Sequence, residues 1–346
     1  KNKMIANFLI DSRHGGPHLY LESLKNNIYQ FKSIDFYQDK FVNDLKLSDL
    51  KTTYKYFFFI DVIINIYKII FYFQKTKKIN TFCVFTIYNI APIISGLILN
   101  KKVNWFILEK PDKFSLLIFK ILNFFFKFKV IVISKSLARF LNIKQYELYF
   151  PDINFKFWNK NKNSRVINSK KKIYLTCTCN INKTKNHLQL LNLIENINFK
   201  IEINIIGRKL SSQLKYYKLL KKKITNLNQT KNLKINLLGK KNKRFIRSFY
   251  QKTHIYVLPS LSEGLSVSLT EAMSAGCICL VSKNSNHSKV INTNNGFEFD
   301  LNKDSFENQL NKITNLKKKQ ILKIKKNGYK TIKNLISKSH KMKLKL

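Results

Sequence analysis

The sequence predicts an α/β protein of two domains, each built on a parallel sheet with helices on its faces. With 346 residues, the chain is longer than a single hydrophobic core usually serves. Short apolar runs of strand length alternate with longer segments of helical periodicity, which is typical of βαβ units. Residues 159–172 are polar, charged and without periodicity, which is typical of a linker. We therefore expect one domain over 1–158 and a second over 159–346.

The first domain starts with a strand in MIANFLI, followed by a turn at Gly15 and Gly16. A helix is predicted over His18–Tyr29, and helices then alternate with strands to the end of the domain. In order, these elements are helix Asp61–Lys77, strand Thr81–Tyr88, helix Ala91–Leu99, strand Val103–Leu108, helix Phe114–Phe126, strand Val130–Ser134 and a short helix from Ser136.

The second domain repeats this alternation. Its predicted elements are strand Ile173–Thr178, helix His187–Ile197, strand Ile201–Ile206, helix Ser211–Leu227, strand Lys234–Leu238, helix Lys243–Gln251, strand Ile255–Leu258, helix Ser268–Ala275 and strand Cys277–Ser282. After Glu307 lysines recur without any Asp or Glu, which predicts a basic terminal helix. Its charge is either a solvated face or a surface that docks on anionic lipid.

The chain is strongly basic, with 64 Lys and Arg against 19 Asp and Glu. Such charge favours polyanions, but it is spread thinly and no aromatic-basic platform accompanies it, so we expect no specific nucleic acid partner. An anionic membrane surface is the better expectation, because lysines flank apolar runs. Residues 56–73 and 114–126 are apolar, but Asp61, Lys68 and Lys120 interrupt them, so we expect peripheral attachment and no insertion.

Five cysteines, an odd number, indicate a reducing compartment, and the apolar run in KNKMIANFLID is too short for a signal peptide. We expect a cytoplasmic protein that attaches to the inner face of a membrane. Cys177-x-Cys179 and Cys277-x-Cys279 offer a four-thiolate zinc site as the alternative to four buried small side chains. No Asp-x-Asp motif occurs, so we expect neither a metal bound by such a pair nor any other cofactor.

The clearest functional pattern lies between His254 and Asp300. A strand ends near Pro259, a loop with Gly264 follows, and a helix opens around Ser268. A strand, a glycine loop and a helix N-terminus present unpaired N–H groups and a positive dipole end, which suit a diphosphate. Glu263 in the loop can accept hydrogen bonds from sugar hydroxyls, and Glu271, placed in the first turn of the helix, can bind a ribose diol. The alternative is a plain turn at Gly264 and a glutamate that merely favours its helix N-terminus.

This segment resembles the family 4 (group 1) glycosyltransferases, whose two glutamates are separated by seven residues within PSxxEG…EAMxxG. The matching residues are Pro259, Ser260, Glu263, Gly264, Glu271, Ala272, Met273 and Gly276, followed by an NGxxF turn at Asn295, Gly296 and Phe297. The resemblance implies the GT-B fold, in which two Rossmann-like parallel-sheet domains face a central cleft. It also implies an acceptor in domain 1–158, a nucleotide sugar in domain 159–346, and transfer with retention of configuration.

Further donor-site residues are implied by the same resemblance. Gly264, Leu265 and Ser266 continue the donor-binding loop. Gly15 and Gly16 stand where the family has a Gly-Gly turn against the diphosphate and the acceptor, although an ordinary turn has the same appearance.

Lys185 resembles the lysine of the basic pair that neutralises the diphosphate. The arginine partner expected near residue 179 or 180 is missing; Lys183 is its candidate replacement, and a solvated loop lysine is the alternative. Many relatives carry a histidine after the strand that corresponds to Val103–Leu108. This chain has Glu109 there, which is either an acceptor-side contact or a plain loop carboxylate.

Together these residues predict a retaining glycosyltransferase that moves a sugar from a nucleotide-sugar donor to a saccharide or lipid-linked acceptor, in cell-envelope polysaccharide or glycolipid synthesis. Glu263 and Lys185 are the expected catalytic residues. Two alternatives stay open: a sugar-nucleotide-binding scaffold without activity, favoured by the missing arginine, and a polyanion-binding protein, favoured by the charge.

Overall fold

The computed structural model divides the chain into two compact units. It describes residues 4–9, 16–27, 33–37, 45, 47, 55–76, 79–126, 128–159, 172–195, 197–230, 232–285 and 290–340. The first unit comprises Lys1–Asp152 with Ile336–Leu346, and the second comprises Ile153–Leu335. The division falls slightly before residue 158 because helix α6 (Phe155–Trp158) packs in the second unit, where the Trp158 ring lies 5.6 Å from that of Tyr250. The domain limits 1–158 and 159–346 stay a prediction, and residues 160–171 of the expected linker lie outside the described residues.

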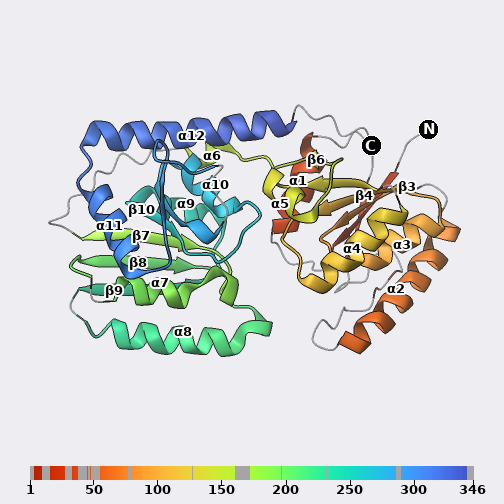
Figure 1. Cartoon of the computed structure of the whole chain (residues 1–346), viewed down its shortest axis with the longest axis horizontal. Coiled ribbons are helices and arrows are strands. Elements are labelled where there is room, and N and C mark those ends of the chain that lie inside the picture. The colour runs from red at the N-terminus through yellow and green to blue at the C-terminus, as the bar shows by residue number, and fades with distance from the viewer. Residues whose placement is uncertain are drawn as a thin grey trace. The chain divides into compact units, whose positions relative to one another are not determined.

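The first unit contains a parallel six-stranded sheet in the order β2-β1-β3-β4-β5-β6 (Figure 1). Its strands are β1 (Met4–Leu9), β2 (Ser33–Tyr37), β3 (Ile79–Phe85), β4 (Lys102–Ile107), β5 (Lys129–Val132) and β6 (Glu147–Leu148). Its helices are α1 (Gly16–Asn27), α2 (Lys55–Lys75), α3 (Ile90–Ile98), α4 (Lys113–Phe125) and α5 (Lys135–Leu141).

The strand order decides which face of this sheet each helix covers. The step from β1 to β2 runs toward one edge of the sheet, and all later steps run toward the other edge. Because crossovers between parallel strands are right-handed, α1 covers one face and α2 to α5 cover the opposite face. Figure 1 shows α2, α3 and α4 together beneath the strands. Aromatic rings fill the sheet interior, and the Phe8 ring lies 5.3 Å from that of Phe36 and 5.0 Å from that of Phe82.

The second unit contains another parallel six-stranded sheet, in the order β12-β11-β10-β7-β8-β9. Its strands are β7 (Ile173–Thr178), β8 (Ile201–Ile206), β9 (Leu233–Gly239), β10 (Ile255–Leu258), β11 (Ile278–Ser282) and β12 (Phe297–Phe299). Its helices are α7 (His187–Ile194), α8 (Leu214–Leu227), α9 (Lys243–Lys252), α10 (Val267–Ser274), α11 (Lys303–Thr314) and α12 (Lys318–His340), with short 3₁₀ turns η1 (Lys183–Lys185), η2 (Ser211–Gln213) and η3 (Lys283–Ser285).

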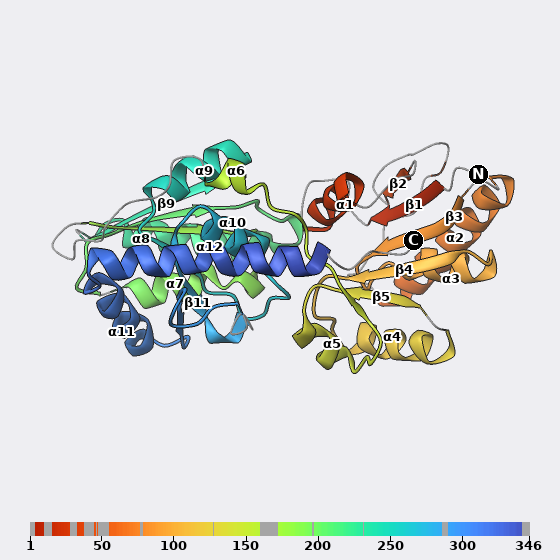
Figure 2. The same ribbon diagram turned by 90° about the horizontal axis from the view of Figure 1, so that it is seen from above.

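The direction of winding in this second sheet reverses at β7. The chain proceeds from β7 to β8 and β9, then returns to the other side of β7 with β10. Right-handed crossovers therefore place α7 and α9 on opposite faces of the sheet, as Figure 2 shows. In open parallel sheets, ligands bind outside the carboxyl ends of the strands at such a reversal. The loops that follow β7 and β10 are thus the expected place for a ligand in this unit.

Asparagine side chains cap the N-termini of several helices. They accept a hydrogen bond from a backbone N–H in the first turns of α6, η1, α9 and α11, and the residues are Asn154, Asn182, Asn242 and Asn302. Ser266 caps α10 in the same way, and Gly276, which follows the C-cap residue Ala275 of that helix, has a φ of 78°. Only glycine adopts this conformation without strain, so the backbone conformation explains why position 276 of the matched motif is a glycine.

The structure corrects several predicted elements. β2 and β6 are short strands that the sequence analysis missed, and α2 begins at Lys55, before the expected Asp61. The basic terminal region forms two helices separated at 315–317, and α12 buries Ile321, Ile332 and other isoleucines along one side. Among the described residues, no helix has both the length and the apolar character needed to cross a membrane.

Candidate active site

Two loops meet at the reversal point of the second sheet through an ion pair. Lys185, from the turn after β7, places its Nζ 2.5 Å from Oε1 of Glu263, from the loop after β10. The Glu263 side chain is 8% exposed and that of Lys185 22% exposed, so the pair is largely removed from water. The two residues that the sequence analysis expected to be catalytic are therefore brought into direct contact.

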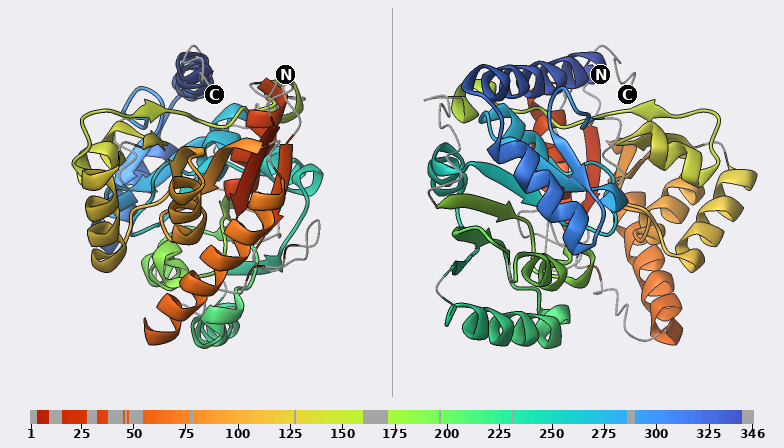
Figure 3. Two further views of the ribbon diagram at one scale, coloured as in Figure 1. Left: turned by 90° about the vertical axis from the view of Figure 1, so that its right-hand side faces the viewer. Right: turned by 60° about the vertical axis from the view of Figure 1, so that its left-hand side comes forward.

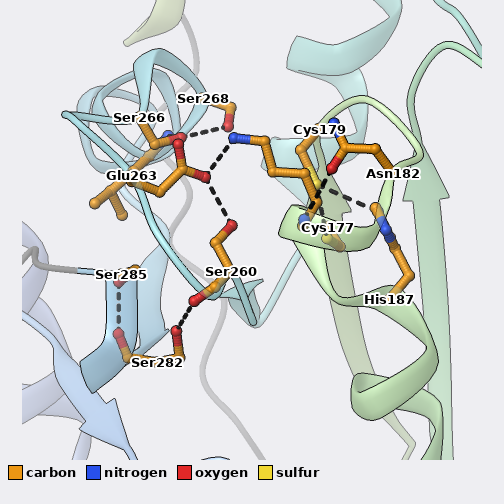
Figure 4. A network of polar contacts seen from close by, with 12 residues as sticks. Cys177, Cys179, Asn182, His187, Ser260, Glu263, Ser266, Ser268, Ser282 and Ser285 are labelled. Atoms are coloured by element: carbon orange, nitrogen blue, oxygen red, sulfur yellow. Dashed lines mark hydrogen bonds and ion pairs between the residues drawn. The ribbon is translucent and has the colours of Figure 1, made fainter. Parts of the chain in front are cut away.

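Hydrogen bonds on both sides hold this ion pair in position (Figure 4). Ser260 Oγ donates to Glu263 Oε1 at 2.7 Å, and Asn182 Oδ1 accepts from the Lys185 backbone N–H at 2.9 Å. The two loops are also joined through their backbones, because Leu261 N–H donates to Thr184 O at 2.8 Å. Behind them, Ser282 Oγ donates to the carbonyl of Ser260. Both charges are thus fixed before any ligand arrives, which is the arrangement that electrostatic stabilisation requires.

The Lys185 ammonium lies in a negatively polarised environment. Burial acts to lower its pKa, but the charges of Glu263 and of the neighbouring Cys179 and Cys177 outweigh burial and raise the pKa above its usual value. Lys185 therefore stays positively charged at physiological pH. Removing Glu263 from contact, for example by a sugar hydroxyl that binds its carboxylate, would leave this charge available to a phosphate.

Cys177, Cys179 and His187 form a second polar cluster (Figure 4), and both cysteines interact electrostatically with Lys185. Their Sγ, Sγ and ring nitrogen atoms lie within 4.8 Å of one another, with Cys179 Sγ 3.3 Å from His187 Nε2. The hydrogen bond from Cys177 lowers the pKa of the Cys179 thiol well below its usual value, and His187 and Lys185 lower it further against the effect of burial.

Three such ligands could hold a soft cation. The Lys185 ammonium already lies within electrostatic reach of both sulfurs, however, and this favours a hydrogen-bonded network centred on the lysine. The other two cysteines of the four-thiolate alternative lie outside this group. Cys277 Sγ donates to the Tyr250 carbonyl at 3.5 Å, and Cys279 Sγ lies 3.8 Å from the Cys277 carbonyl oxygen.

Helix α10 supplies the rest of the predicted donor loop. Leu265 is buried, Gly264 is half-buried, and Ser266 forms the N-cap. Glu271 is only 9% exposed and lies in the second turn of α10, so its prediction in the first turn is wrong. Burial raises the pKa of Glu271 to about 7, and Lys243 opposes this shift. A buried carboxyl group with a pKa near neutrality is characteristic of functional sites.

The other predicted site residues lie elsewhere. Lys183 opens η1 with an exposed side chain. Gly16 is the first residue of α1, and Gly15 lies outside the described residues. Glu109 is exposed and lies just after β4. Its charge acts on Tyr88: the burial of Tyr88 is the main cause that raises the pKa of this tyrosine to about 12, and the charges of Glu109 and Asp112 add to the effect.

Several members of the Lys185 network were not predicted as site residues. Cys177 and Cys179 were expected either as zinc ligands or as buried small side chains, and His187 and Asn182 were given no role in a site. A signal was available in NKTKNH, where Asn182, Lys185 and His187 recur at turn spacing immediately after a strand.

The chain has two parallel sheets, each with helices on both faces, and this architecture defines the GT-B class of protein. Solved structures with this fold match nearly the whole chain. HepE from Anabaena in complex with UDP-glucose matches with a TM-score of 0.78 and 13% identity, over 99% of this chain and 100% of that one. Sucrose-phosphate synthase from Thermosynechococcus elongatus matches with a TM-score of 0.78 and 13% identity, over 98% and 96%. A glycosyltransferase from Rickettsia africae gives 0.75 and 14%, over 99% and 97%.

The family model of glycosyl transferases group 1 matches residues 159–331, half of the chain, and the chain belongs to this family. A curated relative, the UDP-Gal:alpha-D-GlcNAc-diphosphoundecaprenol alpha-1,3-galactosyltransferase of Escherichia coli, is 40% identical over 92 residues. This alignment covers 26% of the present chain and 23% of the relative, so it spans about a quarter of the relative's length.

Proposed function

We propose that this protein is a family 4 glycosyltransferase that transfers a sugar from a nucleotide-sugar donor with retention of configuration. The observation that carries the proposal is the buried Lys185–Glu263 pair at the reversal point of the second sheet, beside the N-terminus of α10. Lys185 and backbone N–H groups at the start of α10 would bind the diphosphate and stabilise the charge that develops on it as the sugar leaves.

In this proposal Glu263 orients the transferred sugar. A sugar hydroxyl that donates to its carboxylate would take over the hydrogen bond now made by Ser260 or the contact with Lys185. Since both contacts hold Glu263 Oε1, the residue is placed as an acceptor of hydrogen bonds. The acceptor hydroxyl would then attack on the face from which the diphosphate departs, without a covalent enzyme intermediate.

Glu271 is proposed to bind the ribose diol of the nucleotide. Two hydroxyl donors satisfy a carboxylate well, and they favour its charged form against the effect of burial. Gly264, Leu265 and Ser266 would line the phosphates. Lys183 would supply the second positive charge in place of the missing arginine.

We further propose that the donor is a UDP-sugar and that the acceptor is a saccharide or a lipid-linked saccharide. Support comes from the relatives: the HepE structure contains UDP-glucose, and the Escherichia coli relative is named for a lipid-diphosphate acceptor. Gly15, Gly16 and Glu109 of the first unit are the proposed acceptor-side residues. The reaction would belong to cell-envelope polysaccharide or glycolipid synthesis at the cytoplasmic face of a membrane, with no metal or cofactor required.

A sugar-nucleotide-binding scaffold without activity is the second candidate, because the arginine expected near Cys179 or Asn180 is missing. The two are separated by incubating the protein with UDP-glucose, UDP-galactose and other nucleotide sugars and measuring both binding and release of the nucleoside diphosphate. Turnover that is lost in Glu263→Gln while UDP still binds supports the transferase. Binding without turnover for any donor and acceptor supports the scaffold. Binding without nucleotide preference and with a steep dependence on salt identifies a general polyanion binder.

A further inference from the structure

We propose that the outward sides of α2 and α4 form one surface that docks on an anionic lipid bilayer. This docking face comprises Phe59, Ile63, Tyr67, Leu117, Ile121 and Phe124, all exposed. The proposal goes beyond the transfer reaction, and it locates membrane attachment on the first unit and not on the basic helix α12. That helix buries Ile321, Ile324, Ile332 and Ile336, and of its large apolar side chains that the structure describes only Leu322 is exposed.

Helix α2 is apolar on two opposite sides. Val62, Ile69 and Phe73 are buried, at the helical spacing expected of a side packed against the sheet. On the other side Ile63 and Tyr67 follow one another at a spacing of four residues, and Tyr67 is 71% exposed. A helix of a soluble protein normally carries polar residues on the side away from the core. The second apolar side of α2 therefore calls for a partner.

Helix α4 has the same two-sided character. Ser115 and Phe119 face inward and are buried, whereas Leu117, Ile121 and Phe124 recur at helical spacing and are exposed. Phe124 is 84% exposed, so its ring gains almost nothing from the fold. Leaving an aromatic side chain in water forgoes the stabilisation that burial of its surface gives.

The two helices present their apolar sides together. Both cover the same face of the sheet, and α3 lies between them (Figures 1 and 3). At their N-terminal ends the rings of Phe59 and Phe114 are 5.9 Å apart. Among the described residues of the second unit, the exposed large hydrophobic side chains are fewer: Leu214 and Leu219 on α8, Leu261 in a loop and Leu322 on α12. Scattered apolar residues are normal on a surface, but a gathered set marks a binding face.

Charge identifies the partner as an anionic bilayer. Residues 55–126, which include both helices, contain ten lysines and three acidic residues. Lys113 and Lys120 are exposed on α4 itself, and long lysine side chains can bury their stems while the ammonium reaches lipid phosphates. A second copy of the chain is the less favoured occupant, because pairing this face with itself would bring lysines against lysines.

The test measures co-sedimentation of the full chain with vesicles of equal parts phosphatidylglycerol and phosphatidylcholine, and with phosphatidylcholine alone. We expect binding to the anionic vesicles that weakens as salt rises from about 0.1 M to about 1 M, since the screening length falls from about 10 Å to about 3 Å. Leu117→Gln with Phe124→Gln should lower the partition coefficient about tenfold or more. The matched control, Leu219→Gln with Leu322→Gln in the second unit, should leave it within about twofold.

A second pair of variants tests the charge contribution. Lys113→Glu with Lys120→Glu should weaken binding to anionic vesicles far more than Lys221→Glu with Lys222→Glu on α8, although both pairs change the net charge equally. Equal effects of the two pairs, or no vesicle binding by the parent, would overturn the proposal. So would a parent dimer that dissociates in the Leu117 and Phe124 variant, which would make the face a protein interface. UDP binding measured without vesicles reports on the donor site separately, so a failure of docking is distinguishable from a failure of the proposed activity.

Discussion

At the scale of single residues, the contact between Lys185 and Glu263 dominates the candidate site. Lys185→Met would leave the Glu263 carboxylate buried with Ser260 as a neutral partner. Breaking a buried pair from one side is costly, so we expect the free energy of unfolding to fall by about 2–4 kcal/mol. Lys222→Met on α8, where the side chain is exposed, is the control and should change it by less than about 0.5 kcal/mol. Denaturant titration measures the free energy of unfolding of both variants. An equal decrease in the two would mean that the buried ion pair does not stabilise the protein more than an exposed lysine does.

Glu271 gives the site a pH dependence whose sign follows from its pKa. The folded-state value of about 7 lies above the usual value of 4.5, so the folded protein holds an extra proton between these limits. Stability from this group is therefore greatest below pH 4.5 and declines, by roughly 3 kcal/mol in total, as the pH rises to 7.

We predict that Glu271→Gln removes this decline. The difference in unfolding free energy between the parent and the variant should change from pH 5 to pH 8, with the variant relatively more stable at pH 8. Because a ribose diol favours the charged carboxylate, the affinity of the parent for UDP should rise over the same range. A difference between the two proteins that does not depend on pH would show that Glu271 keeps an ordinary pKa.

The residues of the site differ in how far the sequence could predict them. Glu263 and Glu271 lie within one continuous motif, and their spacing together with the family resemblance predicted a shared site. The motif could not predict in which turn of α10 Glu271 lies. The first residue of a helix depends on which residue caps it, and the cap, Ser266, lies one residue earlier than expected. The partnership of Lys185 with Cys179 and Glu263 joins two loops distant in sequence, and it requires the strand order of the sheet.

At the scale of elements, the close approach of the ends of β7 and β8 positions the loop that carries Lys185. A Cβ atom on Gly207 would lie 1.8 Å from the carbonyl oxygen of Cys179, a backbone atom that cannot move without displacing the loop. Cys179 N–H in turn donates to Ile206 O at 3.1 Å. Glycine is therefore required where β8 ends.

We predict that Gly207→Ala destabilises the protein by about 1–3 kcal/mol and weakens UDP binding, because the displaced loop carries Lys185, the lysine proposed to bind the diphosphate. Gly328→Ala is the matched control: its Cβ would meet the nearest atoms at 3.4 Å within helix α12, an ordinary contact, and alanine favours the helix. Calorimetric titration with UDP and thermal unfolding provide the two measurements. Normal UDP affinity in a folded Gly207→Ala protein would contradict the positioning role.

The accuracy of the predicted elements followed the strength of their hydrophobic pattern. β7, β8 and β10 were predicted with the bounds that the structure shows, since continuous apolar runs bounded by polar residues fit buried strands. β2 and β6 were missed for different reasons: Ser33 and Asp35 leave β2 without the continuous apolar run of β10, and β6 has only two residues. The early start of α2 was missed for another reason: a run of phenylalanines has no helical periodicity when both sides of a helix are apolar.

At the scale of the whole molecule, the alternation of strands and helices predicted two parallel sheets, but it could not give the order of strands in either sheet. That order results from packing between distant segments, and it alone locates the reversal at β7. A nucleotide bound there should stabilise the second unit more than the first. UDP at about 100 times its dissociation constant would add about 2.7 kcal/mol, and thus several degrees, to the unfolding transition of that unit.

We predict that this thermal shift is retained in EDTA, because Lys185 and backbone amides, and no metal, are proposed to compensate the charge of the diphosphate. Glu271→Ala should reduce the shift, since that variant lacks the proposed partner of the ribose. A shift that vanishes in EDTA and returns with manganese would place a metal in the donor site. A comparable shift with an unrelated polyanion, abolished by moderate salt, would favour the general polyanion binder.

The asparagine caps have a consequence for how such a sequence can evolve. A lineage in which substitutions run toward Asn, Lys, Ile and Phe offers the fold residues that different positions accept for different physical reasons. Asparagine is among the best residues at a helix start, as at Asn154, Asn242 and Asn302, while isoleucine and phenylalanine suit sheet interiors and lysine suits solvent. A bias of this kind would therefore be accepted at many positions without loss of the fold. Its first effect would be on the surface charge, which is +45 in this chain.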